Sequence, residues 1–328
     1  MIKVGKNKNF LLLGTLIATI GLTGCSGINQ KSMSDTTNYD EISAKTEKYE
    51  YFKDCVVRAN EVLLYNIFKD NIGLYNIDNK TWEPIYDSSG NNLFTYNVKG
   101  QEQDDTFYTI GSTSYNDFSV VAYNKECSMA ESLYNMDESD SLIPIGYYND
   151  QKYFIHNKND LGDNETRAIA VLDNDKLTDV VDVENSLLSN AVIINDSLYY
   201  TIYSEKNDNF DLICYSFETK KSDTIKQIPT DQIFRYNDEL LYIGDDNNLL
   251  NLKDKKFYEV KENSDVEIVS DYGIMLETYV DSSSSVSCDV IDLNSNKLLK
   301  TVSDFDGYIL NGSTLELYCE GNIEKLEL

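Results

Sequence analysis

The hexapeptide Asn195-Asp196-Ser197-Leu198-Tyr199-Tyr200 is the clearest copy of a pattern that recurs along this chain. An Asn, an acidic residue and then an apolar run also begin at Asn60, Asn149 and Asn237. Asn and Asp tolerate left-handed backbone and hydrogen-bond their own main chain, so each copy predicts a tight turn that opens into a strand. The Asn-to-Asn spacings are 89, 46 and 42 residues, and 89 is about twice 44, so a copy is missing near 100–105.

A second pattern, a strand that ends in acidic or amide residues and then Lys, follows these turns. It occurs at 75–80, 171–176, 215–220 and 291–297. Together the two patterns divide the chain into four-strand units of about 42 residues, the length of a β-propeller blade. First strands are expected to begin near Asp54, Leu93, Leu142, Ser189, Gln232, Val266 and Gly307. The sequence therefore predicts an all-β, seven-bladed β-propeller over residues 44–328, with six blades and then a pair of β-sandwiches as alternatives.

The two ends of this domain are expected to meet. The last unit contains three strand-like runs before the C-terminus, and the segment 44–52 precedes the first full unit. Because an unpaired sheet edge promotes aggregation, we expect this N-terminal segment to close the ring as the outer strand of the last blade.

Charge excludes several classes of partner. The 328 residues include 28 Lys and Arg against 56 Asp and Glu, a formal charge of -28. Nucleic-acid affinity depends on basic side chains that displace counterions, so we expect no nucleic-acid partner. An anionic lipid surface would also repel the chain. With 41% hydrophobic residues the chain is too apolar for disorder.

The first 25 residues predict export. Lys3, Lys6 and Lys8 precede the apolar run 10–22, which is typical of a signal peptide. The tetrapeptide Leu22-Thr23-Gly24-Cys25 that follows resembles the lipobox of bacterial lipoproteins. The resemblance implies cleavage of the signal peptide 1–24 and attachment of acyl chains such as palmitate at Cys25, with 25–43 as a flexible tether. The exported form would then carry 25 basic and 56 acidic residues, a charge of -31.

The domain itself resembles the β-propeller lipoproteins of Gram-positive bacteria. Its Asn-Asp-x-Leu-Tyr-Tyr repeats are similar to those of low-density-lipoprotein-receptor-like and Tol-type propellers, whereas the Gly-His and Trp-Asp repeat of WD40 proteins is absent. We expect a monomer that is held by its lipid at the extracytoplasmic face of the cell membrane, although the sequence alone does not give the oligomeric state.

Few residues suit thiol or imidazole chemistry. Besides Cys25 there are five Cys residues, none in a Cys-x-x-Cys pair, and we interpret them as core residues whose disulfide state the sequence leaves open. His156 is the only His, which excludes His-based metal sites, and no Gly-x-Ser-x-Gly accompanies it. We therefore predict no catalytic residue among them.

Acidic loops are the remaining candidates. In a four-strand unit, the loops between second and third strands lie at the same end as the connections between units. These loops carry Asp160, Asp163, Glu165, Asp208, Asp211, Asp245 and Asp246, and a further loop spans 281–285. Oxygen-rich loops of this kind suit Ca2+, although solvated acidic loops are commoner. A basic partner is the alternative ligand, because clustered like charge attracts it.

Two function classes stay open. The favoured one is a lipid-anchored binding or scaffold module for a protein, peptide or glycan of the cell envelope, rather than an enzyme. The alternative is a carboxylate-based or Ca2+-dependent hydrolase or lyase that uses the acidic loops, because paired acids are sufficient for general acid-base work.

Overall fold

The computed structural model describes the chain in segments. They are 49–58, 61–66, 71–76, 79, 81–87, 89–93, 101–103, 106–112, 118–124, 129–137, 140–158, 166–183, 188–269, 272–282, 285–311, 313–319 and 322–328. The chain divides into two units, Met1–Thr46 and Glu47–Leu328, and all described residues belong to the second. The predicted signal peptide, Cys25 and tether lie outside the described residues. In the described part, no helix is both long and apolar enough to cross a membrane.

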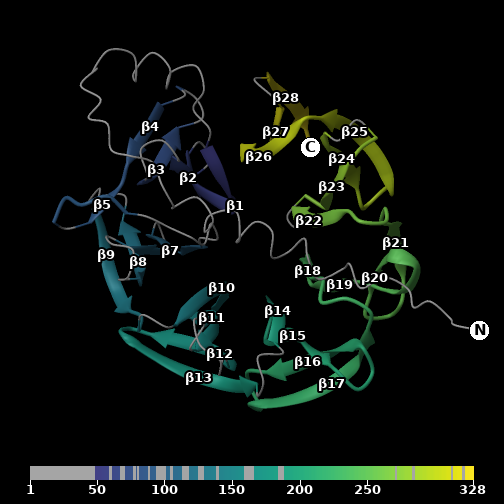
Figure 1. Ribbon diagram of the computed structural model, residues 1–328, viewed down its shortest axis with the longest axis horizontal. Coiled ribbons are helices and arrows are strands. Elements are labelled where there is room, and N and C mark those ends of the chain that lie inside the picture. The colour runs from purple at the N-terminus through teal and green to yellow at the C-terminus, as the bar shows by residue number, and fades with distance from the viewer. Residues whose placement is uncertain are drawn as a thin grey trace, which may run out of the picture. The chain divides into compact units, whose positions relative to one another are not determined.

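Seven sheets follow one another in the described residues (Figure 1). The first contains β1 (Tyr49–Arg58), β2 (Glu61–Asn66), β3 (Asn71–Asn76) and β4 (Thr81–Pro84). The second contains, in spatial order, β5 (Tyr86–Asp87), β9 (Met129–Asn135), β8 (Phe118–Asn124), β7 (Thr106–Ser112) and β6 (Gln101–Gln103). The third contains β10 (Ser141–Tyr148), β11 (Gln151–Lys158), β12 (Thr166–Asp173) and β13 (Lys176–Val183).

The fourth to seventh sheets continue the series. The fourth contains β14 (Leu188–Ile194), β15 (Ser197–Ser204), β16 (Asn209–Ser216) and β17 (Lys221–Ile228). The fifth contains β18 (Ile233–Tyr236), β19 (Glu239–Ile243), the 3-10 turn η2 (Asp245–Asn247), β20 (Asn248–Asn251) and β21 (Lys256–Glu259). The sixth contains β22 (Asp265–Val269), β23 (Ile274–Val280), β24 (Val286–Asp292) and β25 (Lys297–Ser303), and the seventh β26 (Phe305–Asn311), β27 (Thr314–Cys319) and β28 (Asn322–Glu327).

Three of the four predicted Asn-acid turns form as expected, and the fourth, at Asn60, lies outside the described residues. Asn149 and Asp150, between β10 and β11, have φ of 49° and 61°, and Asn195 and Asn237 at the equivalent turns both have φ of 51°. Left-handed backbone at these positions costs Asn and Asp little, and its twist matches that of the paired strands. Five of the seven first strands begin within two residues of the predicted positions, at β10, β14, β18, β22 and β26.

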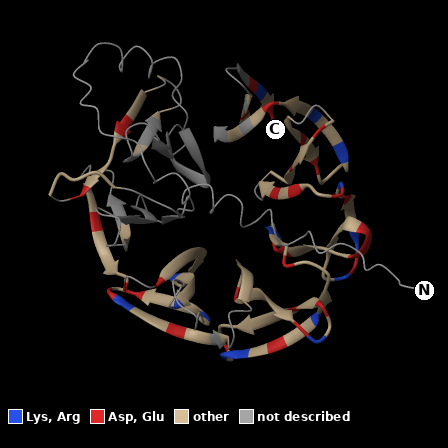
Figure 2. Cartoon of the chain, viewed as in Figure 1, with Lys and Arg blue, Asp and Glu red and all other residues tan. Residues whose placement is uncertain are grey.

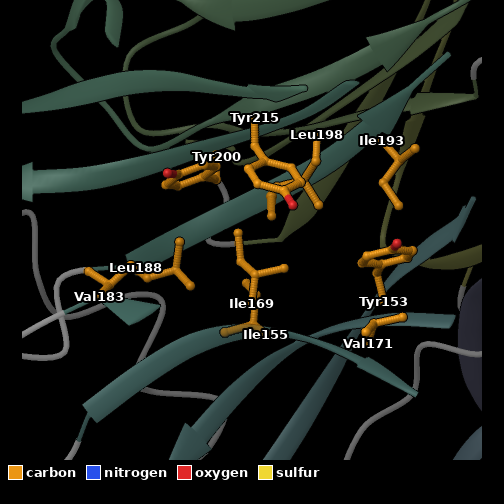
Figure 3. Packing of buried hydrophobic residues seen from close by; sticks show 11 residues of the cluster. Tyr153, Ile155, Ile169, Val171, Val183, Leu188, Ile193, Leu198, Tyr200 and Tyr215 are labelled. Carbon is orange, nitrogen blue, oxygen red and sulfur yellow. The ribbon is translucent and has the colours of Figure 1, made fainter. Parts of the chain in front are cut away.

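Neighbouring sheets pack face to face. Figure 3 shows the cluster between the third and fourth sheets, where Ile155 and Ile169 meet Leu198 and Tyr200. Each such side chain contributes about 1.5–3 kcal/mol by its removal from water. Within Glu47–Leu328, first strands lie side by side from β10 to β14, β18 and β22, and β26 lies beside β1. The predicted all-β propeller is confirmed, while the blade number, seven or six, stays a prediction.

Two details of the prediction are wrong. Within the predicted closing segment 44–52, residues 44–48 lie outside the described residues. Tyr49–Phe52 does not extend the last sheet but begins β1, where Tyr49 pairs with Asn66 of β2, and β28 pairs in the described residues with β27 alone. No turn residue separates Phe52 from Asp54, so one strand runs through the predicted boundary. Leu93 is buried but lies outside any strand, between β5 and β6 of the second sheet.

The antiparallel order within each sheet gives the domain two ends. Connections between sheets and loops between second and third strands lie at one end, here named the link end. It includes 204–209, η2, 260–264 and 281–285. Turns between first and second and between third and fourth strands lie at the other end, the turn end. Figure 2 shows that outer strands such as β13 and β17 carry charges of both signs.

Candidate functional site

Asp208 and Asp211 lie at the link end as predicted, but each has its own neighbour. Asp208, in the loop between β15 and β16, has left-handed backbone and accepts a hydrogen bond of 2.7 Å from the Tyr203 hydroxyl. Asp211 belongs to β16 and accepts a 2.9 Å hydrogen bond from the Gln227 amide on β17. Asp208 therefore stabilises the loop between β15 and β16, and Asp211 stabilises the pairing of β16 with β17.

Asp245 and Asp246 form the exposed 3-10 turn η2. Asp246 has φ of 55°, a conformation that Asp adopts readily. Asp160, Asp163 and Glu165 lie outside the described residues. Within the described ranges, no group of three or more His, Cys, Asp or Glu side chains is placed to hold a metal ion. The described acidic loop residues are thus dispersed around the link end.

His156 stands between two carboxylates, an arrangement named here the His156 cluster. Its Nε2 lies 3.0 Å from Asp140 Oδ2 and its Nδ1 lies 2.9 Å from Asp179 Oδ1. Carboxylates only accept hydrogen bonds, so both ring nitrogens bond them at once in the cationic, doubly protonated form. Lys158 Nζ lies 2.5 Å from Asp179 Oδ2. Burial raises the pKa of Asp179, but hydrogen bonds from Lys158 and His156 outweigh burial and leave that pKa below its ordinary value.

Lys261 lies between two other carboxylates at the link end, here named the Lys261 cluster. Glu277 of β23 and Asp289 of β24 are directly opposite each other across the strand pair, so their side chains share one face. Glu277 is fully buried and Asp289 is almost so. The Lys261 ammonium bonds Asp289 Oδ2 and lies 4.0 Å from Glu277 Oε2, while its backbone N–H donates to Glu277 Oε1.

Hydroxyl and aromatic groups complete the Lys261 cluster. Thr301 and Tyr279 donate hydrogen bonds of 2.6 and 3.3 Å to Asp289 Oδ1. The Tyr279 ring also faces Lys261, whose Nζ is 3.4 Å from the ring centroid. The Ser264 hydroxyl is 3.1 Å from Glu277 Oε1 and 2.9 Å from the Lys261 carbonyl, and donates to one of them at a time. The ammonium is therefore held by charge, hydrogen bonding and a cation–π contact.

Burial and the charges of the Lys261 cluster shift the pKa values of Lys261 and of two neighbouring side chains. Burial lowers the pKa of Lys261, but hydrogen bonds to Asp289 and Tyr279 outweigh burial and raise that pKa above its ordinary value. Burial, with Glu277 and Asp289 nearby, raises the pKa of the Tyr258 hydroxyl. Burial, with Asp289 and Glu267 nearby, raises the pKa of the Cys288 thiol to about 12. Cys288 is accordingly an inert core thiol, as predicted.

Sequence reasoning missed the Lys261 cluster because it examined loops rather than strands. A signal was present: Glu277 follows the apolar run 274–276, and Asp289 lies between Cys288 and Val290. Acidic residues inside apolar strands are rarely buried unless they are paired, so such positions predict a cation or a proton nearby. Its source, Lys261 in the connection between β21 and β22, was not predicted.

Comparisons with known proteins identify a fold. No family model matches this chain, and no curated protein matches its sequence. Similar solved structures include an oligogalacturonate lyase in complex with manganese, at TM-score 0.60 and 10% identity over 84% of this chain and 87% of that one. An oligogalacturonate lyase of Vibrio parahaemolyticus has TM-score 0.57 and 11% identity over 85% and 89% of the two chains.

A third neighbour has a different activity. It is a puromycin-hydrolyzing peptidase of Mycobacterium tuberculosis, with TM-score 0.60 and 10% identity over 86% of this chain and 53% of the peptidase. At such identities the likeness shows the shared fold alone, since one fold carries many functions.

Proposed function

We propose that this chain is an exported lipoprotein, anchored through Cys25, whose propeller binds a protein, peptide or glycan of the cell envelope at its link end. The lipobox-like tetrapeptide at 22–25 supports the anchor. A basic partner is favoured, because the chain carries twice as many acidic as basic residues and long-range attraction speeds the encounter of opposite charges.

The observation that carries this proposal is the composition of the described link end. Asp245 and Asp246 are exposed there, and the hairpin of β23 and β24 presents Val280 and Val286, which are 64% and 44% exposed. These two Val residues pair across the strands. An end of a domain that exposes both apolar and acidic side chains suits contact with a protein or peptide.

Substitution of two pairs of acids at opposite ends tests the proposal. The probe is a labelled cationic peptide with alternating Lys and Leu, measured by fluorescence anisotropy at low and at physiological salt. Asp245→Asn with Asp246→Asn is expected to weaken binding, and Val280→Ser with Val286→Ser to weaken it further. The matched control is Asp173→Asn with Asp175→Asn, two exposed acids at the turn end, which is expected to leave the affinity unchanged. Equal losses in the two Asp pairs would contradict a specific link-end site.

The anchor is tested separately. Cys25→Ser is expected to abolish incorporation of labelled palmitate and to release the protein from the membrane fraction of cells that express it. A variant that stays membrane-bound and labelled would contradict attachment at Cys25.

An enzyme is the second candidate. It is favoured by the likeness in fold to two oligogalacturonate lyases and by the carboxylate pair Glu277 and Asp289, which a substrate would reach only after Lys261 moves aside. Paired carboxylates support acid-base chemistry on glycans, but a polyanionic substrate such as oligogalacturonate would be repelled by a chain of charge -28. Turnover of neutral or basic glycans that is lost in both Glu277→Gln and Asp289→Asn would support this candidate, whereas unchanged turnover in both variants would exclude this pair.

A further inference from the structure

The Lys261 cluster contains two carboxylates but only one ammonium group. Glu277 and Asp289 bring two carboxylates, and Lys261 brings one ammonium. Burial of a charge without a counter-charge costs several kcal/mol, so such sites take up a proton or a cation.

One oxygen of Glu277 has no hydrogen-bond donor in the described part of the chain and is therefore the place where a further cation would bind. Glu277 Oε2 is buried and has no hydrogen-bond partner among the described residues, although Glu277 Oε1 accepts the Lys261 backbone N–H. The Glu277 side chain is 0% exposed, so bulk water does not serve this oxygen. Glu277 Oε2 therefore has a cation 4.0 Å away but no hydrogen-bond donor from the residues that the structure describes, which is unusual for a buried carboxylate oxygen.

We propose that the Lys261 cluster is a binding site for a hard divalent cation of the Ca2+ class, which takes the place of the Lys261 ammonium. Glu277 Oε2 and Asp289 Oδ2 are the carboxylate ligands. Thr301 and Tyr279 hold Asp289 Oδ1 by hydrogen bonds and so orient that carboxylate as supporting groups. Water fills the rest of the six to eight oxygen positions that Ca2+ prefers, from the side where Lys261 is 40% exposed, away from the buried Glu277.

Charge selects a divalent ion over a monovalent one. Two carboxylates and one ammonium leave one negative charge, whereas two carboxylates and one divalent cation leave none. The Lys261 side chain is 40% exposed and lies in the connection between β21 and β22, so its ammonium moves to solvent without an opening of the sheet. Two carboxylate ligands without an octahedral arrangement favour Ca2+ over Mg2+, which demands a tighter octahedral shell.

The site is expected to be weak, because only two carboxylates contribute and an ammonium competes. Dissociation constants of about 0.1–1 mM are typical of Ca2+ sites in extracellular modules. At about 10 mM Ca2+, the thermal unfolding midpoint of the full chain should rise by about 2–4 °C through binding to the folded state. Mg2+ at the same concentration should give a smaller rise.

Two variants distinguish a cation site from a purely structural ion pair. Glu277→Gln should abolish the Ca2+-dependent rise, whereas the matched control Glu316→Gln, at another buried Glu bonded to a Lys, should keep it. Lys261→Met should lower the midpoint without Ca2+ and tighten Ca2+ binding severalfold, because no ammonium then competes for the two carboxylates.

The outcomes decide the proposal in each case. The absence of a rise in the unmodified chain, or an equal rise in Glu277→Gln, would overturn it. If Glu277→Gln fails to fold, calorimetric titration of Lys261→Met decides: tighter Ca2+ binding supports the site, and unchanged or absent binding overturns it. The readout is independent of any partner of the link end, so its failure leaves the proposed binding function untouched.

Discussion

The His156 cluster and the Lys261 cluster both place a basic side chain between two carboxylates, yet they differ in the number of basic side chains. Asp140 and Asp179 meet two basic side chains, His156 and Lys158. Glu277 and Asp289 meet one, and one oxygen of Glu277 stays without a donor. The difference teaches that a carboxylate pair is structural where each carboxylate has its own basic partner, and that a buried pair with fewer basic partners is a candidate for ligand binding.

Loss of Asp289 should have the largest effect. Asp289→Ala removes the acceptor of three donors, from Lys261, Tyr279 and Thr301, and should lower the free energy of unfolding by about 3 kcal/mol at roughly 1 kcal/mol for each hydrogen bond. Urea denaturation at neutral pH measures this loss. A loss below about 1 kcal/mol would mean that the donors find water, and that the cluster is less buried than its geometry indicates.

Loss of the imidazole should cost somewhat less. His156→Leu leaves Asp140 and Asp179 without the imidazole that lies between them, but Lys158 still neutralises Asp179. We expect about 2 kcal/mol of destabilisation, from two charge-assisted hydrogen bonds and the carboxylate left behind. The same denaturation measurement applies, and Lys158→Met in the same background should add a further loss. A single variant as stable as the unmodified chain would remove the basis for calling this cluster balanced.

The two clusters should respond with opposite sign when one carboxylate is neutralised. Glu277→Gln removes the unmatched charge and keeps Oε1 as an acceptor, so stability should be unchanged or rise by up to about 1 kcal/mol. Asp140→Asn removes a matched charge and should lower stability by about 1 kcal/mol. Both changes are isosteric, and unfolding in urea without added Ca2+ measures them. Destabilisation of equal size in both would show that charge balance does not separate the clusters.

Acid should weaken the His156 cluster by the smallest amount. The pKa of Asp179 is lower in the folded chain than the ordinary 3.8, so its contribution is complete above that value and is lost as the pH falls through the folded pKa. The difference in unfolding free energy between the unmodified chain and Asp179→Asn, less than about 1 kcal/mol, should shrink between pH 7 and about pH 3. Asp175→Asn, at an exposed turn residue, serves as the control. A difference that stays constant with pH would contradict the lowered pKa.

The fold could be predicted from the sequence where local chemistry determines it. Asn149, Asn195 and Asn237 adopt left-handed backbone in the turns of their hairpins, a local property of the sequence. Their spacing therefore predicted where the sheets from β10 to β21 lie. The second sheet was mispredicted, because β5 joins it by parallel pairing with β9, a contact between distant residues.

The candidate site was harder to predict, for a related reason. The loop acids Asp208, Asp211, Asp245 and Asp246 are visible in the sequence, but local composition does not show whether folding brings them together. Glu277 and Asp289 are twelve residues apart and meet only through strand register, and Lys261 reaches them from the preceding connection. Their grouping is tertiary, and a pattern of turns and strands does not contain it.

Nearly every strand in the described residues pairs with the strand that precedes or follows it in the chain, and β5 with β9 is the departure. Contacts between close sequence neighbours form early and cost little loop-closure entropy, which favours rapid folding. Each sheet from β10 onward can therefore complete itself as soon as its own residues have left the ribosome or an export channel. The chain is suited to vectorial folding from its N-terminus, in which each finished sheet offers an apolar face on which the next sheet packs.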